Sequence, residues 1–186
     1  VMLAVAILVA VLPTPLCAQG PGKRLMTPQD LWAMKRLSNP ELSPDGRTAA
    51  IVVQEWSIEK NKPTSNIWLV PVAGGEPRRL TTAQAADGSP AWSPDGRKIA
   101  YVRSGESQWI YYMPWQLAVV DVQSGLESQP ALLDQFVIKP VWSADNRHVF
   151  ALLESPQAMH AGKVDTLSGQ VSRLSAGARF DYGIAV

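Results

Sequence analysis

The sequence of 186 residues contains a single cysteine, two histidines and nearly balanced charge, with 17 Lys and Arg against 16 Asp and Glu. The cysteine, Cys17, lies in an apolar N-terminal stretch, so the rest of the chain cannot form a disulfide, a thiolate metal site or a cysteine nucleophile. A formal net charge of +1 argues against binding to nucleic acid or to an anionic membrane surface. Those classes of partner are therefore not expected.

Residues 1–18 are expected to form a secretory signal peptide. Val1 to Leu12 are apolar, and a more polar stretch follows in which Ala18 suits the position before a cleavage site. A membrane-spanning helix needs about 20 apolar residues, and this run ends before Pro13, so a transmembrane anchor is the less favoured alternative. We therefore predict a secreted or periplasmic protein that is not membrane-bound after cleavage.

One turn recurs three times along the chain. It reads Ser-Pro-Asp-Gly-Arg twice and Ser-Ala-Asp-Asn-Arg once, and its Asp residues are spaced by 50 residues. Gly readily adopts positive φ, and Asn tolerates it best among residues with a Cβ, so all three copies are predicted to end equivalent hairpins in the left-handed conformation. A period of this size indicates stacked structural repeats. The turn residues are Asp45, Gly46, Asp95, Gly96, Asp145 and Asn146.

Strand signals surround each turn. A Pro-x-Trp-Ser strand end places Trp92 and Trp142 at one repeat position, where the first repeat has Leu42. An apolar run follows each turn, and then come another strand, a tight turn bearing Gly and an exposed outer strand. Four strands per repeat are typical of a β-propeller blade. We predict that Trp92, Trp142 and Leu42 occupy equivalent core sites, and that Trp68 also lies in a blade core.

The predicted fold class is therefore all-β: a partial β-propeller of about three four-stranded, WD40-like or TolB-like blades. The blades are placed at residues 38–89, 90–138 and 139–177, and a further blade starts at 178–186. An all-β sandwich with accidentally similar turns is the alternative. Because propellers close with about 4–8 blades, we expect this chain to be a fragment.

A short helix is predicted in the leader segment 19–37, before the first blade. Thr27 is a good N-cap, Pro28 is tolerated at the first helical position, and Asp30 complements the helix dipole. The helical pattern extends over 27–37, and we expect it to pack on the first blade, with a role as a docking helix as the alternative. The predicted apolar face consists of Leu31, Met34 and Leu37.

These motifs follow one another in a recognisable order. It resembles the start of secreted bacterial peptidases of the prolyl oligopeptidase family, especially the acylaminoacyl- and dipeptidyl-peptidase-like branch, over residues 27–186. The resemblance implies an N-terminal propeller above an α/β-hydrolase domain with a Ser-Asp-His triad, admitting only small peptides. Periplasmic propellers of the Tol system share the turn motif. The segments that carry the resemblance are Thr27–Leu31, Ser38–Arg47, Asn66–Leu69, Gly74–Thr81 and Pro90–Arg97.

The sequence offers no catalytic residue that fits that resemblance. It contains no Gly-x-Ser-x-Gly nucleophile elbow, and the nearest segment, Gly105–Trp109, lacks the second Gly. His148 follows a blade turn, which favours a solvated strand-edge residue over a general base. His160 is predicted to lie in a connection with no carboxylate nearby in sequence to orient it. The Asp residues of the turns are explained by turn chemistry, so no metal or cofactor site is predicted.

One aromatic-rich segment, residues 104–115, departs from the repeat. An exposed aromatic loop on a rigid scaffold is a candidate for substrate or partner contact, and the alternative is a loop folded back onto its own blade or onto a hydrolase domain. Glu55 and Trp56, in the corresponding connection of the first blade, could face the same way. The candidate contact residues are Trp109, Tyr111, Tyr112 and Trp115.

Two classes of function remain open. In the first, the chain is the propeller part of a secreted serine peptidase, which gates access to the active site and whose partners are its own C-terminal α/β-hydrolase domain and small peptide substrates. In the second, it is a periplasmic TolB-like propeller that binds proteins without catalysis. This chain alone is not expected to be an enzyme, whereas the full-length family it resembles is.

Overall fold

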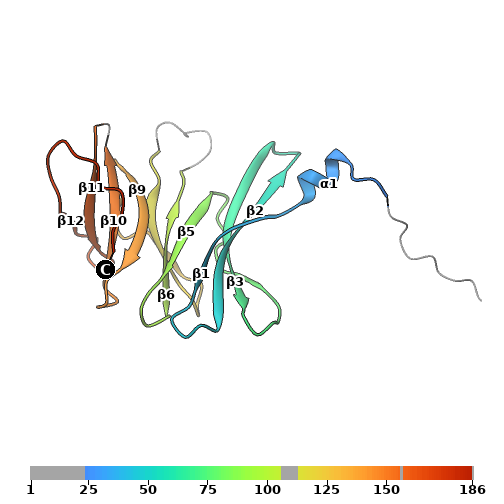
Figure 1. Ribbon diagram of the computed structural model, residues 1–186, viewed down its shortest axis with the longest axis horizontal. Coiled ribbons are helices and arrows are strands. Elements are labelled where there is room, and N and C mark those ends of the chain that lie inside the picture. The colour runs from blue at the N-terminus through green and yellow to red at the C-terminus, as the bar shows by residue number, and fades with distance from the viewer. Residues whose placement is uncertain (1–23, 106–112, 156, 186) are drawn as a thin grey trace, which may run out of the picture.

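The computed structural model describes residues 24–105, 113–155 and 157–185, and shows three four-stranded antiparallel sheets standing side by side (Figure 1). Within each sheet the strands follow one another in chain order, so each sheet is one blade. The all-β partial propeller predicted from the repeat is therefore confirmed. Among the described residues, no helix has the length and apolar character needed to cross a membrane.

The first blade contains β1 (Arg36–Leu42), β2 (Thr48–Ser57), β3 (Lys62–Pro71) and β4 (Arg78–Arg79). The second contains β5 (Asp87–Trp92), β6 (Lys98–Arg103), β7 (Gln116–Asp121) and β8 (Glu127–Ser128). The third contains β9 (Phe136–Trp142), β10 (His148–Ser155), β11 (Ala158–Asp165) and β12 (Val171–Arg173). The fourth strand of each blade is short and lies at the outer edge.

The three repeated turns have the geometry that the sequence predicts. Gly46 and Gly96 both have φ 69°, and Asn146 has φ 56°. In each turn this residue donates its backbone N–H to the carbonyl of the turn's serine, at 2.8 Å in the first two blades and 3.2 Å in the third. Asn146 thus preserves the hairpin at the one copy that lacks Gly.

The hydrophobic core consists of two layers, one between each pair of neighbouring blades. Alternate residues of β6 face opposite sides: Ile99 and Tyr101 contribute to the layer with the first blade, and Ala100 contributes to the layer with the third. The central strands are therefore apolar on both faces, because each sheet is covered on both sides. Each layer buries residues from two blades that neither blade could bury alone.

The tryptophans at the end of the innermost strands join neighbouring blades. Trp142 is 5% exposed and its Nε1 donates to the carbonyl of Ala91 at 3.0 Å, while Nε1 of Trp92 donates to the carbonyl of Glu41 at 3.1 Å. Trp92 is half-buried. The prediction for Leu42 is wrong: this side chain is 61% exposed, because the face of the first blade on which it lies has no blade packed against it among the described residues.

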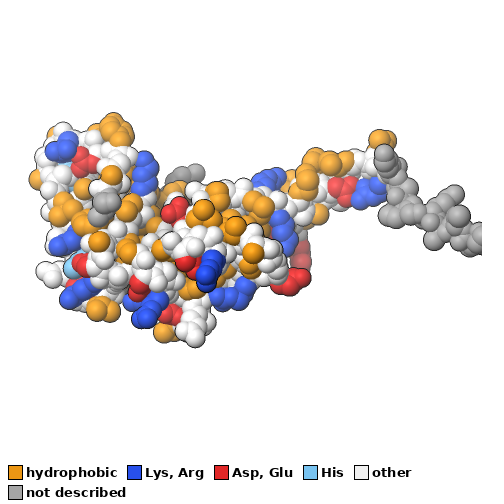
Figure 2. Space-filling view, turned by 60° about the horizontal axis from the view of Figure 1, so that its bottom comes forward, with side chains coloured by type: hydrophobic (Ala, Val, Ile, Leu, Met, Phe, Trp, Pro, Cys, Tyr) orange, Lys and Arg blue, Asp and Glu red, His pale blue; other side chains and the backbone are white. Residues whose placement is uncertain are grey.

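Helix α1 (Pro28–Ala33) is shorter than the predicted 27–37, because the chain is already extended at Met34 and enters β1. Thr27 and Asp30 form the expected capping box. The helix contacts the first blade through Trp32, whose ring meets that of Trp56 edge-on with centroids 5.3 Å apart, rather than through the predicted face. That face stays exposed on an N-terminal arm that projects from the blades (Figure 2).

Trp68 also differs from the prediction. It is half-buried on the outer face of the first blade rather than in a core layer, and Nζ of Lys35 lies 5.4 Å above its ring. The same lysine forms an ion pair of 2.6 Å with Glu55. Residues that the sequence assigned to a core or contact role are therefore used to hold the N-terminal arm against β2 and β3.

We predict that replacing Trp142 with Ala lowers the free energy of unfolding by about 3–5 kcal/mol, because a large buried ring and its bond to Ala91 are both lost. Leu42→Ala is the matched control at the same repeat position. With 61% of Leu42 exposed, it should change stability by about 0.5 kcal/mol or less. Denaturant titration followed by tryptophan fluorescence or circular dichroism measures both, and equal losses would contradict the difference in burial between the two positions.

Candidate functional site

A polar side chain on each third strand, buried at Asn66 and His160 and half-buried at Gln116, fixes the crossover to the next blade. The three side chains stand opposite positions 53, 103 and 153 of the second strands, so they are structural equivalents. Each bonds a residue of the crossover, which positions the innermost strand that follows. The pairs are Asn66 Nδ2 with the carbonyl of Ala83 (3.1 Å), Gln116 Nε2 with the carbonyl of Leu133 (2.8 Å), and His160 Nδ1 with Ser175 Oγ (3.3 Å).

His160 therefore does not lie in a connection, as the sequence predicted, but in β11, where it is 3% exposed. Ser175 Oγ donates onward to the carboxylate of Asp181, which also accepts the backbone N–H of Ala161 at 3.1 Å. A carboxylate 21 residues away thus completes the chain of hydrogen bonds from this histidine. Since His160 serves the same structural purpose as an Asn and a Gln in the other blades, it needs no catalytic role.

Each innermost strand carries a β-bulge with a left-handed residue at its centre. Asn39 and Ser89 have φ 50° and Lys139 has φ 52°, and each of them directly precedes a proline. The pairing register shifts at this point in all three blades. Positive φ at non-glycine residues is uncommon and costly, and bulges often redirect side chains near functional sites. The sequence signal for these bulges is a residue before proline that recurs every 50 residues, at positions 39, 89 and 139.

A cavity of about 450 Å³ opens beside the first two of these bulges. Asn39 and Ser89 line it, together with Lys62 from the tip of the hairpin between β2 and β3. The apolar part of the wall comes from both neighbouring blades and from the third, so the cavity exists only because the blades are packed together. The apolar lining includes Pro63, Val102, Met113, Trp115 and Ile138.

A buried ion pair lies at the wall of this cavity. The carboxylate of Asp87, whose side chain is fully buried, accepts Nε of Arg103 at 2.7 Å and Nη2 at 3.0 Å. Arg103 also pairs with Glu127 on β8 at 2.6 Å. The bidentate geometry satisfies both oxygens of Asp87, which offsets part of the cost of burying its charge.

The other two blades have apolar residues where the second blade has this pair. Asp87 stands opposite Arg103 in the register of β5 and β6, as Val137 stands opposite Leu153 in the third blade. The first blade has Leu37 opposite Val53. The sequence signal for this ion pair is that Asp87 and Arg103 stand at repeat positions that are apolar in the other two blades.

Tyr101 belongs to the same network. Its hydroxyl donates to Glu127 at 3.2 Å, and the Arg103 guanidinium lies 5.2 Å from its ring. Burial, followed by the charge of Asp87, raises the pKa of the Tyr101 hydroxyl well above its usual range. Tyr101 therefore stays a neutral hydrogen-bond donor, and the network acts as a rigid, charge-paired support beneath the cavity.

The aromatic contact loop predicted from the sequence is placed only in part. Trp115 is described: it is 48% exposed, lines the cavity and meets Phe136 edge-on with centroids 6.0 Å apart. Its carbonyl accepts the N–H of Val137 at 2.8 Å, so it is tied to the start of β9. The other candidates, Trp109, Tyr111 and Tyr112, lie outside the described residues.

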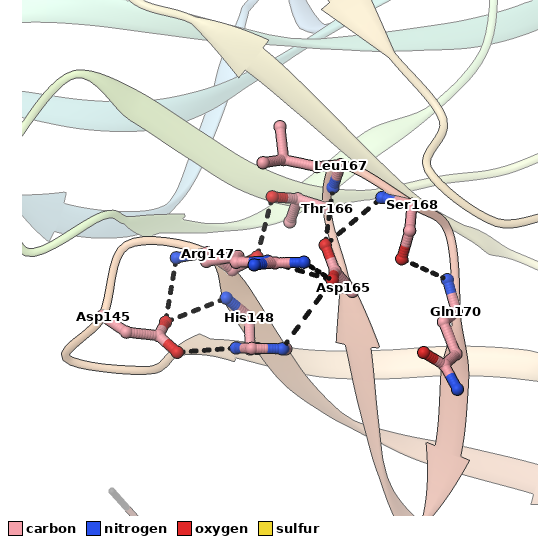
Figure 3. Close-up of polar contacts among 8 residues, drawn as sticks. All are labelled: Asp145, Arg147, His148, Asp165, Thr166, Leu167, Ser168 and Gln170. Carbon is pink, nitrogen blue, oxygen red and sulfur yellow. Dashed lines mark hydrogen bonds and ion pairs between the residues drawn. The ribbon is translucent and has the colours of Figure 1, made fainter.

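The opposite end of the third blade carries a polar cluster around its turn (Figure 3). His148 is not simply solvated, as predicted. Its Nδ1 lies 2.6 Å from Oδ2 of Asp145, and its Nε2 lies 3.9 Å from Oδ2 of Asp165. Arg147 donates to Asp165 at 2.6 Å through Nη2. The cluster ties the turn between β9 and β10 to the end of β11, which is a structural role.

The three four-stranded sheets agree with the family that the sequence matches. The family model described as the TolB beta propeller domain matches residues 33–182, and the chain belongs to that family. A solved structure described as putative TolB from Agrobacterium tumefaciens superposes with a TM-score of 0.59 at 26% identity, covering 75% of this chain and 46% of that one.

Among curated proteins the chain is similar to peptidases. It is 31% identical over 129 residues to YuxL of Bacillus subtilis, described as an uncharacterized peptidase, covering 68% of this chain and 19% of that protein. It is 32% identical over 101 residues to dipeptidyl-peptidase 5 of Porphyromonas gingivalis, covering 54% of this chain and 15% of that protein. The chain thus spans less than a fifth of each peptidase, and the resemblance to peptidase propellers is confirmed.

We predict that Arg103→Ala lowers the free energy of unfolding by about 3–5 kcal/mol, since it leaves Asp87 buried without its partner. The double variant Asp87→Val with Arg103→Leu copies the apolar pair of the third blade and should recover at least half of that loss. Denaturant unfolding of both variants and the parent protein measures this. If the double variant were less stable than Arg103→Ala, the equivalence of the blades at this position would be wrong.

We also predict a loss of stability in acid that depends on the turn cluster. The Arg147 hydrogen bond and the N–H of Leu167 lower the pKa of Asp165, and the backbone and side chain of His148 lower that of Asp145, in both cases well below the usual range. A carboxyl whose pKa is lower in the folded state stabilises the fold above its unfolded pKa of about 3.9 and loses that contribution as pH falls further.

Thermal unfolding measured between pH 7 and pH 2 tests this expectation. The melting temperature should fall below about pH 4, and the fall should be shallower in Asp165→Asn, which keeps an oxygen to accept the N–H groups of the turn but cannot titrate. Asp134→Asn, at an exposed position outside the cluster, is the control. An acid response that is identical in the two variants would remove Asp165 from this explanation.

Proposed function

We propose that this chain is the substrate-gating propeller of a secreted serine peptidase that acts on short peptides. The catalytic α/β-hydrolase domain would be supplied by a part of the protein outside this chain and would be the propeller's main partner. The apolar segment at residues 1–18 supports export to the periplasm or the exterior. After its removal, neither a membrane nor a nucleic acid is an expected partner.

The observation that carries this proposal is the similarity to proteins described as peptidases, which extends over 129 residues at 31% identity. The position of the cavity adds to it. The cavity lies beside the innermost strands, where the left-handed bulges and an exposed tryptophan meet. A propeller that presents polar and aromatic groups beside this cavity could select short peptides on their way to a catalytic domain.

A periplasmic protein-binding scaffold is the second candidate. It is favoured by the 26% identity to a structure described as putative TolB. In that case the exposed apolar arm and the cavity would contact a protein partner, and no catalytic domain would be required.

Labelling with a serine-directed fluorophosphonate separates the two functions. The product of the complete reading frame should cleave short peptides and become labelled on one serine outside this chain. Residues 19–186 expressed alone should be neither labelled nor active, because they contain no nucleophile elbow. A folded complete protein that is never labelled would support the scaffold, and a label within residues 19–186 would contradict both candidates.

A further inference from the structure

The cavity between the first two blades has the size and lining of a small-ligand site. Its volume of about 450 Å³ falls in the range of about 300–1,000 Å³ that is usual for ligand pockets. Val102 of β6, Trp115 just before β7 and Ile138 of β9 provide apolar walls. Such a space suits one apolar side chain with part of the backbone that carries it.

The two charged residues among the described lining of the cavity differ in how available they are to a ligand. Among its described lining residues only Asp87 and Lys62 are charged. Both oxygens of Asp87 are engaged by Arg103, and its side chain is fully buried, so it cannot bind a peptide ammonium group. Of these two described charges, the one that remains is that of Lys62, a half-buried residue. This arrangement is complementary to a carboxylate and unfavourable for an amine.

The two bulges supply polar groups for a peptide backbone. The register of β1 with β2 shifts between Ser38 and Glu41, and that of β5 with β6 shifts between Gly88 and Ala91. A bulge leaves its extra residue out of the ladder. Asn39 and Ser89, which carry a side-chain amide and a hydroxyl, therefore line the cavity beside backbone that the sheet itself does not use.

We propose that this cavity binds the C-terminal residue of a short peptide. The apolar side chain of that residue lies between Val102, Trp115 and Ile138, and its α-carboxylate pairs with Lys62. Asn39 and Ser89 bond the last peptide group. The proposal rests on the proposed function in taking a peptide as the ligand, and it adds that the propeller recognises the carboxyl end rather than the amino end.

The test measures the binding of three probes to the complete protein by isothermal titration calorimetry, after the protein has been treated with the fluorophosphonate. The probes are N-acetyl-Ala-Leu with a free carboxylate, N-acetyl-Ala-Leu-amide, and Ala-Leu-amide with a free amine. The carboxylate probe should bind about tenfold more tightly than either amide, as expected for one hydrogen-bonded ion pair.

Three variants assign the preference to the cavity. Lys62→Gln should reduce the affinity for the carboxylate probe to that for the amide, whereas Lys62→Arg should retain most of the preference. Lys60→Gln changes an exposed lysine in the same hairpin that does not line the cavity, and it should behave as the parent protein does. Circular dichroism checks that each variant is folded.

The outcomes separate this proposal from the proposed function. Equal binding of the acid and amide probes, a preference for the free amine, no binding of any probe, or a carboxylate preference that survives Lys62→Gln would each overturn the carboxylate site. Peptide hydrolysis is assayed in parallel on untreated protein. Hydrolysis without a carboxylate preference would exclude only the proposed carboxylate site. A carboxylate preference without hydrolysis or labelling would exclude only the peptidase function.

Discussion

The packing of one sheet face against the next is the constraint on which the rest of this structure depends. Every four-stranded sheet in the described chain is too small to form a core of its own, and its central strands are apolar on both faces. The indole bonds from Trp92 and Trp142 to the preceding blade fix how neighbouring sheets are offset. The same packing explains why Leu42, at the equivalent position of the first blade, is exposed.

Polar side chains within this apolar stack lie toward the end of the blades that carries the cavity. One amide or imidazole in each blade holds the crossover, and in the second blade a bidentate ion pair stands where the other blades have an apolar pair. An apolar pair of similar volume is often at least as stable as a buried ion pair. The charged pair of Asp87 and Arg103 therefore points to a requirement of the cavity wall rather than of the fold. In the proposed site, this pairing occupies the acidic group and leaves Lys62 as the unpaired charge among the described lining residues.

Features that suit ligand binding coincide at one end of the blades. Bulges with left-handed residues, an exposed tryptophan and a cavity lie at one end of the blades, whereas the turns that carry the repeat lie at the other. The turn end is held by local hydrogen bonds, such as those around Asp165 (Figure 3), and serves stability. Loops and strand ends on a rigid scaffold are the usual place for binding residues, which is why the proposed recognition site is placed at the cavity end.

The sequence by itself determined the repeat, the four-strand blade and the left-handed turns, because these depend on local turn chemistry and on a spacing that can be counted. Its ordered motifs also carried the resemblance to peptidase propellers. It did not determine which of the repeated positions are buried. Trp142 is buried and Leu42 is exposed at the same repeat position, since burial depends on which neighbour covers a face. The helix ended early because β1 pairs with β2 from Arg36 onward, and His160 lies in a strand whose polar partners, Ser175 and Asp181, are distant in sequence. The cavity is formed by side chains from three blades, so only the tertiary structure could bring Lys62, Asn39, Ser89 and Trp115 together.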